Sequence, residues 1–252
     1  MTTRLKTTLD SNLYTQIGLD SGSLTMLGTI VHQLGEPGEY RGALHHGADV
    51  KAVFFILADS SSPVAQVTVD LAALEKAQSG APASDAEEWC GCAGDSKDSS
   101  GGKRYTVNPR GYVLFHVQGG QGGYYVHLRR IDAAENDKGY DTRTLKSGDA
   151  FTAMMLRPGA YSIRNTLTKA VAEAVVRYPI IGDKPYVPPA PVRIECTANG
   201  FDIKGRLDLG VGQGLVFNAR TDSRIEIKLE KPDDGPPRPN RGRTGFQKVQ
   251  LA

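Results

Sequence analysis

The feature that most constrains this chain is a strict alternation of apolar and polar residues over short segments. In residues 224–230, Ile225, Ile227 and Leu229 alternate with charged residues, and residues 192–197 alternate in the same way. Side chains of a strand point to opposite faces in turn, so a period of two predicts strands that are buried on one face only. The C-terminal third of the chain is therefore predicted to be β-structure.

Two hairpins are expected from this alternation and from the turns between the alternating segments. Residues 113–117 and 124–128 flank a Gly-rich loop, and residues 215–218 precede residues 224–230 across a polar turn at 219–223. For both apolar sets of the first hairpin to share one face, Phe115 must face Val126 and His116 must face Tyr125. This register places His127 diagonally opposite His116 on the polar face.

Further strands are predicted at residues 25–32, 51–58, 65–69, 150–156, 161–165 and 172–178. Helix signals are few: Asp70 is a candidate N-cap for residues 71–78, and Ser84 with Glu87 has the spacing of a capping box. No repeat of fixed period is evident. These patterns predict an all-β protein of two β-sandwich-like units, with a few short helices in the insertion between them.

Composition changes at several places along the chain. Residues 79–103 are rich in Gly, Ser, Ala and Asp, which is typical of a linker or long loop, and residues 182–191 contain four prolines. We therefore predict an N-terminal β unit at 1–78, an insertion at 79–103, a C-terminal β-sandwich unit at 104–231 and a Pro/Arg-rich tail at 232–252.

The charge balance excludes some classes of partner. The 252 residues carry 30 Lys and Arg against 28 Asp and Glu, and the net charge of +2 lies entirely in residues 232–252. A nucleic-acid partner is therefore not expected. The longest apolar run, residues 52–58, is too short to cross a bilayer, and the first residues lack the apolar core of a secretory signal. A cytoplasmic protein without membrane contact is expected.

Residues 192–230 resemble the core of a cupredoxin-like β-sandwich. The resemblance is carried by Asn199-Gly200-Phe201, by the strand at 207–209, by Gly212-Gln213-Gly214 and by the strand at 215–218. It implies the sandwich fold but not the copper centre of that family, which needs two histidines and a cysteine. Where copper-binding members supply a histidine this chain has Arg224, and the tail contains no Cys, His or Met.

Several Cys and His residues are candidate metal ligands. Cys90 and Cys92 are separated by one residue, whereas the usual zinc and redox motifs have two residues between the cysteines, so reduced surface thiols are the alternative interpretation. His45 and His46 are adjacent, and neighbouring strand residues point to opposite faces, so they can share one ion only if Gly47 opens a turn. Copper or zinc is the metal that these side chains would suit.

The predicted register of the first hairpin adds a second candidate surface. His116 and His127 would lie close enough to share an ion, and Tyr112, Tyr125 and Arg129 would form a partner-binding face around them. An ordinary amphipathic face covered by the same chain is the alternative. In the tail, Phe246, Val249 and Leu251 are candidate anchors on a partner, whereas a solvated end is the alternative.

Known catalytic motifs are missing from the sequence, and both Gly-rich loops precede strands rather than helices, which argues against phosphate loops. The leading hypothesis is a non-catalytic binding or assembly protein that associates with itself or with another protein, without a cofactor. The alternative is a metal-binding or redox protein that uses the histidines or the two loop cysteines. An enzyme with an unfamiliar site is the third alternative.

Overall fold

The computed structural model describes residues 17–79, 102–134, 139–179, 186–203, 205–233 and 235. Within these residues the chain forms strands β1 to β17 and one helix, α2 (Leu71–Gln78). The predicted all-β fold is confirmed. The strands belong to three sheets, which are called A, B and C below.

Sheet A contains β1 (Gly18–Asp20), β17 (Ile225–Pro232), β11 (Gly159–Asn165), β12 (Val171–Arg177) and β15 (Leu207–Gly210), in that spatial order. Sheet B contains β6 (Lys103–Val107), β4 (Asp49–Ala58), β3 (Gly38–His46), β8 (Tyr124–Arg130) and β9 (Tyr140–Asp141). Sheet C contains β14 (Gly200–Phe201), β13 (Val192–Thr197), β16 (Gly214–Ala219), β10 (Ala150–Met154), β2 (Gly28–His32), β7 (Tyr112–His116) and β5 (Gln66–Asp70).

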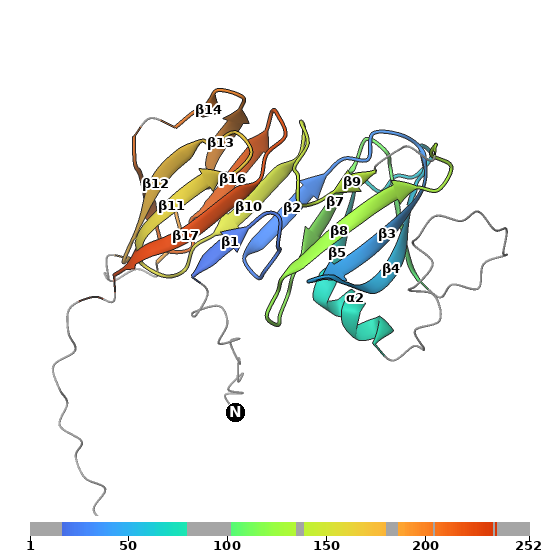
Figure 1. The fold of residues 1–252 in the computed structure, drawn as a ribbon, viewed down its shortest axis with the longest axis horizontal. Helices are drawn as coiled ribbons and strands as arrows, with labels where there is room; N and C mark the ends of the chain where they lie inside the picture. The colour runs from blue at the N-terminus through green and yellow to red at the C-terminus, as the bar shows by residue number, and fades with distance from the viewer. Residues whose placement is uncertain are drawn as a thin grey trace, which may run out of the picture.

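Sheets A and B lie side by side on the same face of sheet C, so the molecule is two β-sandwiches that share one long sheet (Figure 1). A row of directly paired residues crosses sheet C on that inner face, and every member is fully buried. The row consists of Ile194, Phe217, Phe151, Ile30, Phe115 and Val69. Because this row joins both sandwiches, they have one continuous hydrophobic core.

The two sandwiches have the same topology. Five strand pairings of the first half recur in the second half, each with the same relative direction. The matching pairings are β3–β4 and β11–β12, β4–β6 and β12–β15, β3–β8 and β11–β17, β2–β7 and β10–β16, and β5–β7 and β13–β16. The first strand of each half also completes the sheet of the other half, since β1 pairs with β17 and β9 pairs with β8. Residues 18–130 and 139–232 are thus two copies of one fold, related by an approximate two-fold axis through the antiparallel pair β2–β10.

Individual hydrogen bonds repeat between the halves. The Thr142 hydroxyl accepts from the amide of Val126 at 2.8 Å, and the Ser21 hydroxyl accepts from the amide of Ile225 at 2.9 Å. Ser21 and Thr142 also donate their own amides to the carbonyls of Ile225 and Val126. Such paired side-chain and backbone bonds fix the first strand of each half on the last strand of the other.

The equivalent turns share sequence as well as geometry. A Pro-Gly-x-Tyr motif occurs at residues 37–40 and 158–161. Gly38 and Gly159 have φ angles of 145° and 148°, which favour glycine. The hydroxyls of Tyr40 and Tyr161 each donate to the carbonyl four residues earlier. No repeat of fixed period was evident from the sequence, yet the two halves are a duplication that these motifs share.

Both predicted hairpins are wrong in their pairing, although their strands exist. β7 belongs to sheet C and β8 to sheet B, so Phe115 and Val126 point at each other's sheet across the core. In the same way β16 belongs to sheet C and β17 to sheet A. The loops at 118–123 and 220–224 therefore cross between the two layers of a sandwich instead of closing a hairpin.

The six further strands and the helix at 71–78 are confirmed, whereas the capping box at Ser84 and Glu87 lies outside the described residues. The predicted domain boundaries do not separate the sheets. Strands occupy parts of all six further segments, and Asp70 accepts a hydrogen bond from the amide of Ala72 as the N-cap of α2. The insertion at 79–103 lies inside the first half, because β6, β7 and β8 follow it in the chain. The change from one half to the other occurs between Arg130 and Tyr140.

Candidate functional site

The adjacent histidines point to opposite faces of sheet B, as the period of a strand requires. His45 lies on the outer face, where its ring stacks on Tyr125 with centroids 4.5 Å apart. His46 lies on the inner face, 4.6 Å from the ring of Tyr124, and its Nδ1 is 3.3 Å from Oε1 of Glu75. The two imidazoles are therefore not positioned to share one ion.

The predicted pair of His116 and His127 is not formed. His116 points outward from sheet C together with Tyr112, which is 46% exposed. His127 points outward from sheet B, between Tyr125 and Arg129 on β8. The outer faces of the two sheets of a sandwich point in opposite directions, so the two histidines lie on opposite surfaces. The predicted partner-binding residues Tyr112, Tyr125 and Arg129 are separated in the same way.

The outer face of sheet B carries an ordered stack of aromatic and charged side chains. The guanidinium carbon of Arg143 lies 4.4 Å from the Tyr125 ring centroid, on which His45 also stacks. Arg143 donates from Nη2 to Oδ2 of Asp141 at 2.6 Å, which holds the guanidinium in place. Burial lowers the pKa of His45, and neighbouring His127 and Arg143 lower it further. The carboxylate of Asp141 acts on the pKa of His45 in the opposite direction, so charges of both signs surround the stack.

Glu75 links α2 to both inner aromatic groups at the end of the sandwich. Its carboxylate accepts a hydrogen bond from the Tyr124 hydroxyl and contacts His46. The bond from Tyr124 lowers the pKa of Glu75, and the contact with His46 lowers it further. Burial and the same carboxylate raise the pKa of Tyr124. This arrangement stabilises the docking of the helix on sheet B.

The exchange Glu75→Gln should cost stability at neutral pH but not in acid. A carboxylate whose folded pKa lies below its usual value near 4.5 contributes stability above that value, and the contribution is lost as the pH falls through the folded pKa. We expect the difference in free energy of unfolding between the parent and Glu75→Gln to shrink from pH 6.5 to pH 3. Urea unfolding at both pH values measures it, and a difference independent of pH would contradict the assignment.

The outer face of sheet C differs from the other outer faces because it has no charge at its centre. None of the outward-facing residues on its four central strands, all within the described part of the chain, is Lys, Arg, Asp or Glu. They are Thr29, Val31, Tyr112, Leu114, His116, Ala150, Thr152, Met154, Gly214, Val216 and Asn218. In contrast, the outer face of sheet A carries Arg164, Glu173, Arg177, Glu226, Lys228 and Glu230.

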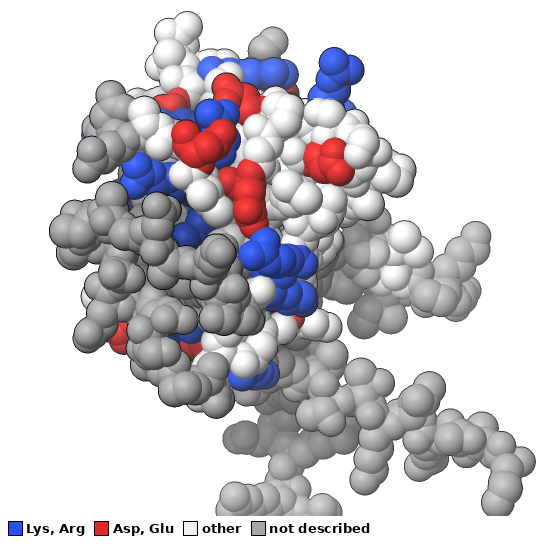
Figure 2. All heavy atoms as spheres, turned by 90° about the vertical axis from the view of Figure 1, so that its right-hand side faces the viewer, with Lys and Arg blue, Asp and Glu red and all other residues white. Residues whose placement is uncertain are grey.

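This uncharged surface, called the open face below, was not identified from the sequence. Sheets A and B both cover the inner side of sheet C, so no described sheet covers the open face. On the end of the molecule formed by the first sandwich, by comparison, basic and acidic side chains are interspersed (Figure 2). The signal in the sequence was that the outward-facing residues of four strands carry no charge. It can be recognised only once these four strands are known to be neighbours in one sheet.

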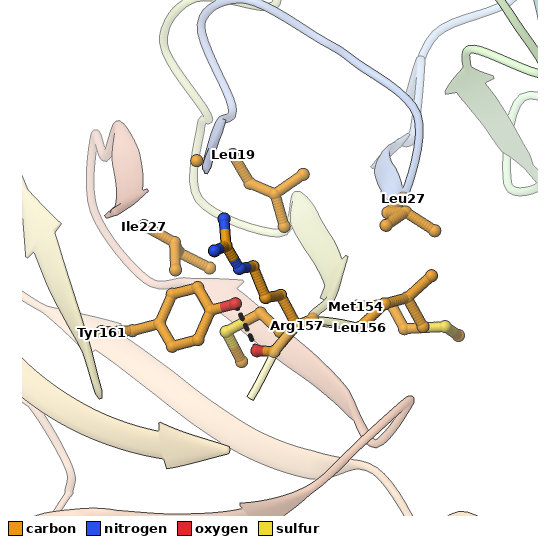
Figure 3. Close-up of a pocket in the computed structure, with 9 residues that line it drawn as sticks. Leu19, Leu27, Met154, Leu156, Arg157, Tyr161 and Ile227 are labelled. Atoms are coloured by element: carbon orange, nitrogen blue, oxygen red, sulfur yellow. Dashed lines mark hydrogen bonds between the residues drawn. The ribbon is translucent and has the colours of Figure 1, made fainter. Parts of the chain in front are cut away.

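A cavity of about 20 Å³ lies between sheets A and C in the second half. Leu19, Leu27 and Ile227 lie around it, and Tyr161 donates to the carbonyl of Arg157 at 2.7 Å beside it (Figure 3). A water molecule needs about 10–15 Å³ of such space, so the cavity holds at most a molecule of that size. It is therefore not a ligand site.

A cluster of polar side chains lies at one end of the β2–β10 pair. Nδ1 of His32 lies 2.7 Å from Oδ1 of Asp149, which is 3% exposed, and the His32 ring stacks on Tyr140 with centroids 3.5 Å apart. At the other end of the β2–β10 pair, the equivalent partners are Gly28 and Ala153. His32, Tyr140 and Asp149 thus connect β2, β9 and the residue that precedes β10.

Cys90, Cys92, Phe246, Val249 and Leu251 lie outside the described residues. Among the described residues, no three His, Cys, Asp or Glu side chains are grouped as a metal ion requires. The described Cys196 is fully buried, and burial raises the pKa of its thiol to about 12. The described helix is not long and apolar enough to span a membrane.

Comparisons with protein families, with curated proteins and with solved structures found no match to this chain. The resemblance of residues 192–230 to cupredoxin-like sandwiches stays a prediction. Arg224, at the position where copper-binding members have a ligand, donates from Nη2 to Oδ2 of Asp20 at 2.7 Å. The function of the candidate surfaces is therefore inferred from the residues that form them.

Proposed function

We propose that this protein is a non-catalytic assembly protein that associates with a second copy of itself through the open face of sheet C. The observation that carries the proposal is the absence of charge from the central outward positions of this sheet, all of which are described. The centres of protein interfaces are depleted of charged residues and enriched in aromatic residues and Met. Tyr112 and Met154 are 46% and 39% exposed on this face.

The charges at the two edges of the open face support a second copy as the partner. Arg193 on β13 and Asp70 on β5 belong to the same cross-strand row, at opposite edges of the sheet. A two-fold axis that runs along the strands between β2 and β10 brings Arg193 next to Asp70 of the partner subunit. The symmetry forms this contact twice, because a two-fold interface uses the same patch on both copies.

The size of the face is consistent with a dimer that dissociates on dilution. Neighbouring strands are about 4.8 Å apart and each residue extends a strand by about 3.3 Å, so six strands of five residues cover about 480 Å². Side chains add to this flat area, so two copies together would bury about 1,000 Å². This is the lower bound for a specific interface. A concentration-dependent equilibrium is therefore expected.

Sedimentation of the full chain over a range of concentrations tests this proposal. The exchange Thr152→Lys places an uncompensated charge at the centre of the open face in both copies, and the dissociation constant should rise at least about 100-fold. The matched control is Val175→Lys, which adds the same charge to the outer face of sheet A, where Arg177 and Glu173 already lie. The control should associate like the parent.

Two outcomes would overturn the proposal. One is a parent chain that sediments as a monomer at every concentration. The other is an equal loss of association in Thr152→Lys and Val175→Lys, since that result would place the interface elsewhere. Circular dichroism and thermal unfolding of each variant establish that the comparison is made between folded proteins.

A further inference from the structure

Sheet C ends at β5, and this strand has a free edge. β5 runs parallel to β7, and the carbonyl of Ala65, just before β5, accepts from the amide of Tyr112. Alternate residues of a strand direct their backbone groups to the same side, so Gln66 and Thr68 direct theirs away from β7. Both residues are exposed, and no described residue forms a hydrogen bond with these backbone groups.

The second half of the protein covers the equivalent edge with its own chain. β13 corresponds to β5, because the parallel pair β5–β7 recurs as β13–β16. Residues 200–202 lie along its outer edge: β14 pairs with the end of β13, and Asp202 donates its amide to the carbonyl of Glu195. Oδ1 of Asp202 also accepts from the amide of Glu195 at 2.8 Å. In the first half the chain enters α2 after β5 instead, so the same edge stays open.

Two other edge strands carry features that discourage pairing with another chain. β6, at the edge of sheet B, begins with the exposed residues Lys103 and Arg104, and such charges protect edges from association. At β15, the edge of sheet A, Tyr186 and Pro189 lie against Gly210. The five residues of β5, in contrast, include no Lys, Arg or Pro and no bulge, and three of them are the β-branched Val, Thr and Val.

We propose that β5 pairs in antiparallel orientation with β5 of a second copy of the chain, so that the two C sheets become continuous. With a two-fold axis at Val67, Gln66 lies opposite Thr68 of the partner subunit, and the symmetry repeats this pair. The members of such a pair exchange both of their N–H···O bonds, so about four bonds form. They satisfy all free backbone groups of Gln66 and Thr68 in both copies.

The surroundings of β5 select this register. An axis at Gln66 would place Thr68 opposite Val64, whose carbonyl already accepts from the amide of Asn108. With the axis at Val67, the two Val67 side chains occupy a pair without hydrogen bonds, in which opposite side chains approach most closely. Val67 is half-buried against the core of its own chain. Its contact with the second copy therefore covers apolar surface that a single chain leaves accessible.

The β5 contact and the open face lie on different sides of sheet C, so one chain can use both. Each two-fold contact alone gives a closed dimer, whereas two different two-fold contacts on one chain link the copies into an open-ended row. The row rests on the proposed open-face dimer, but the pairing of β5 does not. The full chain should therefore form species larger than a dimer as its concentration is raised.

Sedimentation of the full chain at increasing concentration tests the pairing. Thr68→Pro removes a donor from the free edge, a position at which strands tolerate proline, and this variant should form no species larger than the open-face dimer. Thr68→Ala is the matched control, because it removes the same side chain but keeps the N–H, and should associate like the parent. Gln66→Pro repeats the test at the first residue of the strand. Circular dichroism and thermal unfolding identify any variant that does not fold.

The exchange Thr152→Lys separates the two contacts. It disrupts the open face, so the dimer that remains at high concentration should form through β5, and the added exchange Thr68→Pro should abolish it. A Thr152→Lys chain that is monomeric at every concentration would overturn the pairing of β5 without the use of a proline variant.

Other outcomes would overturn the β5 contact and leave the open face intact. One is a parent chain that never exceeds a dimer, with Thr68→Pro and Thr68→Ala forming the same dimer. Another is the persistence of larger species in both Thr68→Pro and Gln66→Pro. An equal loss of larger species in Thr68→Ala and Thr68→Pro would exclude pairing through the backbone.

Discussion

The exchange Phe151→Ala should lower the free energy of unfolding by about 3–5 kcal/mol, the range observed when a buried Phe is reduced to Ala. Phe151 is fully buried on β10, pairs directly with Phe217 and Ile30, and its ring centroid lies 6.1 Å from that of Phe217. It is therefore the point at which the inner row of sheet C passes from one sandwich to the other. Removal of its ring leaves a cavity that both halves share.

Urea unfolding monitored by circular dichroism measures this effect, with Thr152→Ala as the control on the same strand. Thr152 points outward, so its exchange should change the free energy of unfolding by less than about 0.5 kcal/mol. Because the core is continuous, both sandwiches should unfold in one transition. Two separate transitions, with only one of them shifted by Phe151→Ala, would show that the halves fold independently.

The exchange Asp149→Ala should cost about 3–5 kcal/mol, as expected when one partner of a buried pair is removed. The Asp149 carboxylate contacts His32 at 2.7 Å and accepts from the amide of Lys146 at 2.6 Å, and the residue is 3% exposed. Without it, the amide of Lys146 and the imidazole of His32 lose their acceptor. Thermal and urea unfolding of the variant measure the loss.

A double-mutant cycle separates the pair from its surroundings. His32→Ala combined with Asp149→Ala should cost less than the sum of the single exchanges by more than about 1 kcal/mol, because residues in direct contact are coupled. The double variant approaches the composition at the other end of the β2–β10 pair, where Gly28 and Ala153 are accommodated. Simple additivity of the two single exchanges would contradict a direct interaction between His32 and Asp149.

The failure of both predicted hairpins has a common physical reason. Alternation within a segment indicates which residues are buried, but not which other strand packs against them. Phe115 and Val126 are both fully buried, and this observation fits equally well two strands of one sheet or two strands of facing sheets. Sequence proximity favours the first arrangement. The structure adopts the second, because the loops at 118–123 and 220–224 pass over the end of each sandwich.

The candidate surfaces illustrate the same limit. That His45 and His46 point to opposite faces followed from the period of a strand alone, and the structure confirms it. The free edge of β5 could not be recognised in the same way. Its position at the end of sheet C depends on the pairing of β5 with β7 alone, which no pattern within residues 66–70 indicates.

The duplication of the fold could be recognised only in part from the sequence. The motifs Gly-x-Asp-(Ser/Thr)-x-(Ser/Thr)-Leu at 18–24 and 139–145 and Pro-Gly-x-Tyr at 37–40 and 158–161 are equally far apart in the chain. The two motifs could have been recognised in the sequence, but they are short, and the two halves otherwise differ in sequence. The hydrogen bonds that those residues make give the similarity its physical meaning.

The sequence by itself determined the local structure of this protein. The β-class, the strands with one buried face and the capped helix α2 follow from alternation and capping, which act over a few residues. Only the tertiary structure decided the partner of each strand, the exchange of β1 and β9 between the halves and the shared sheet with its open face. These features depend on contacts between residues distant in the chain, and such contacts are selected by the burial of all apolar faces together.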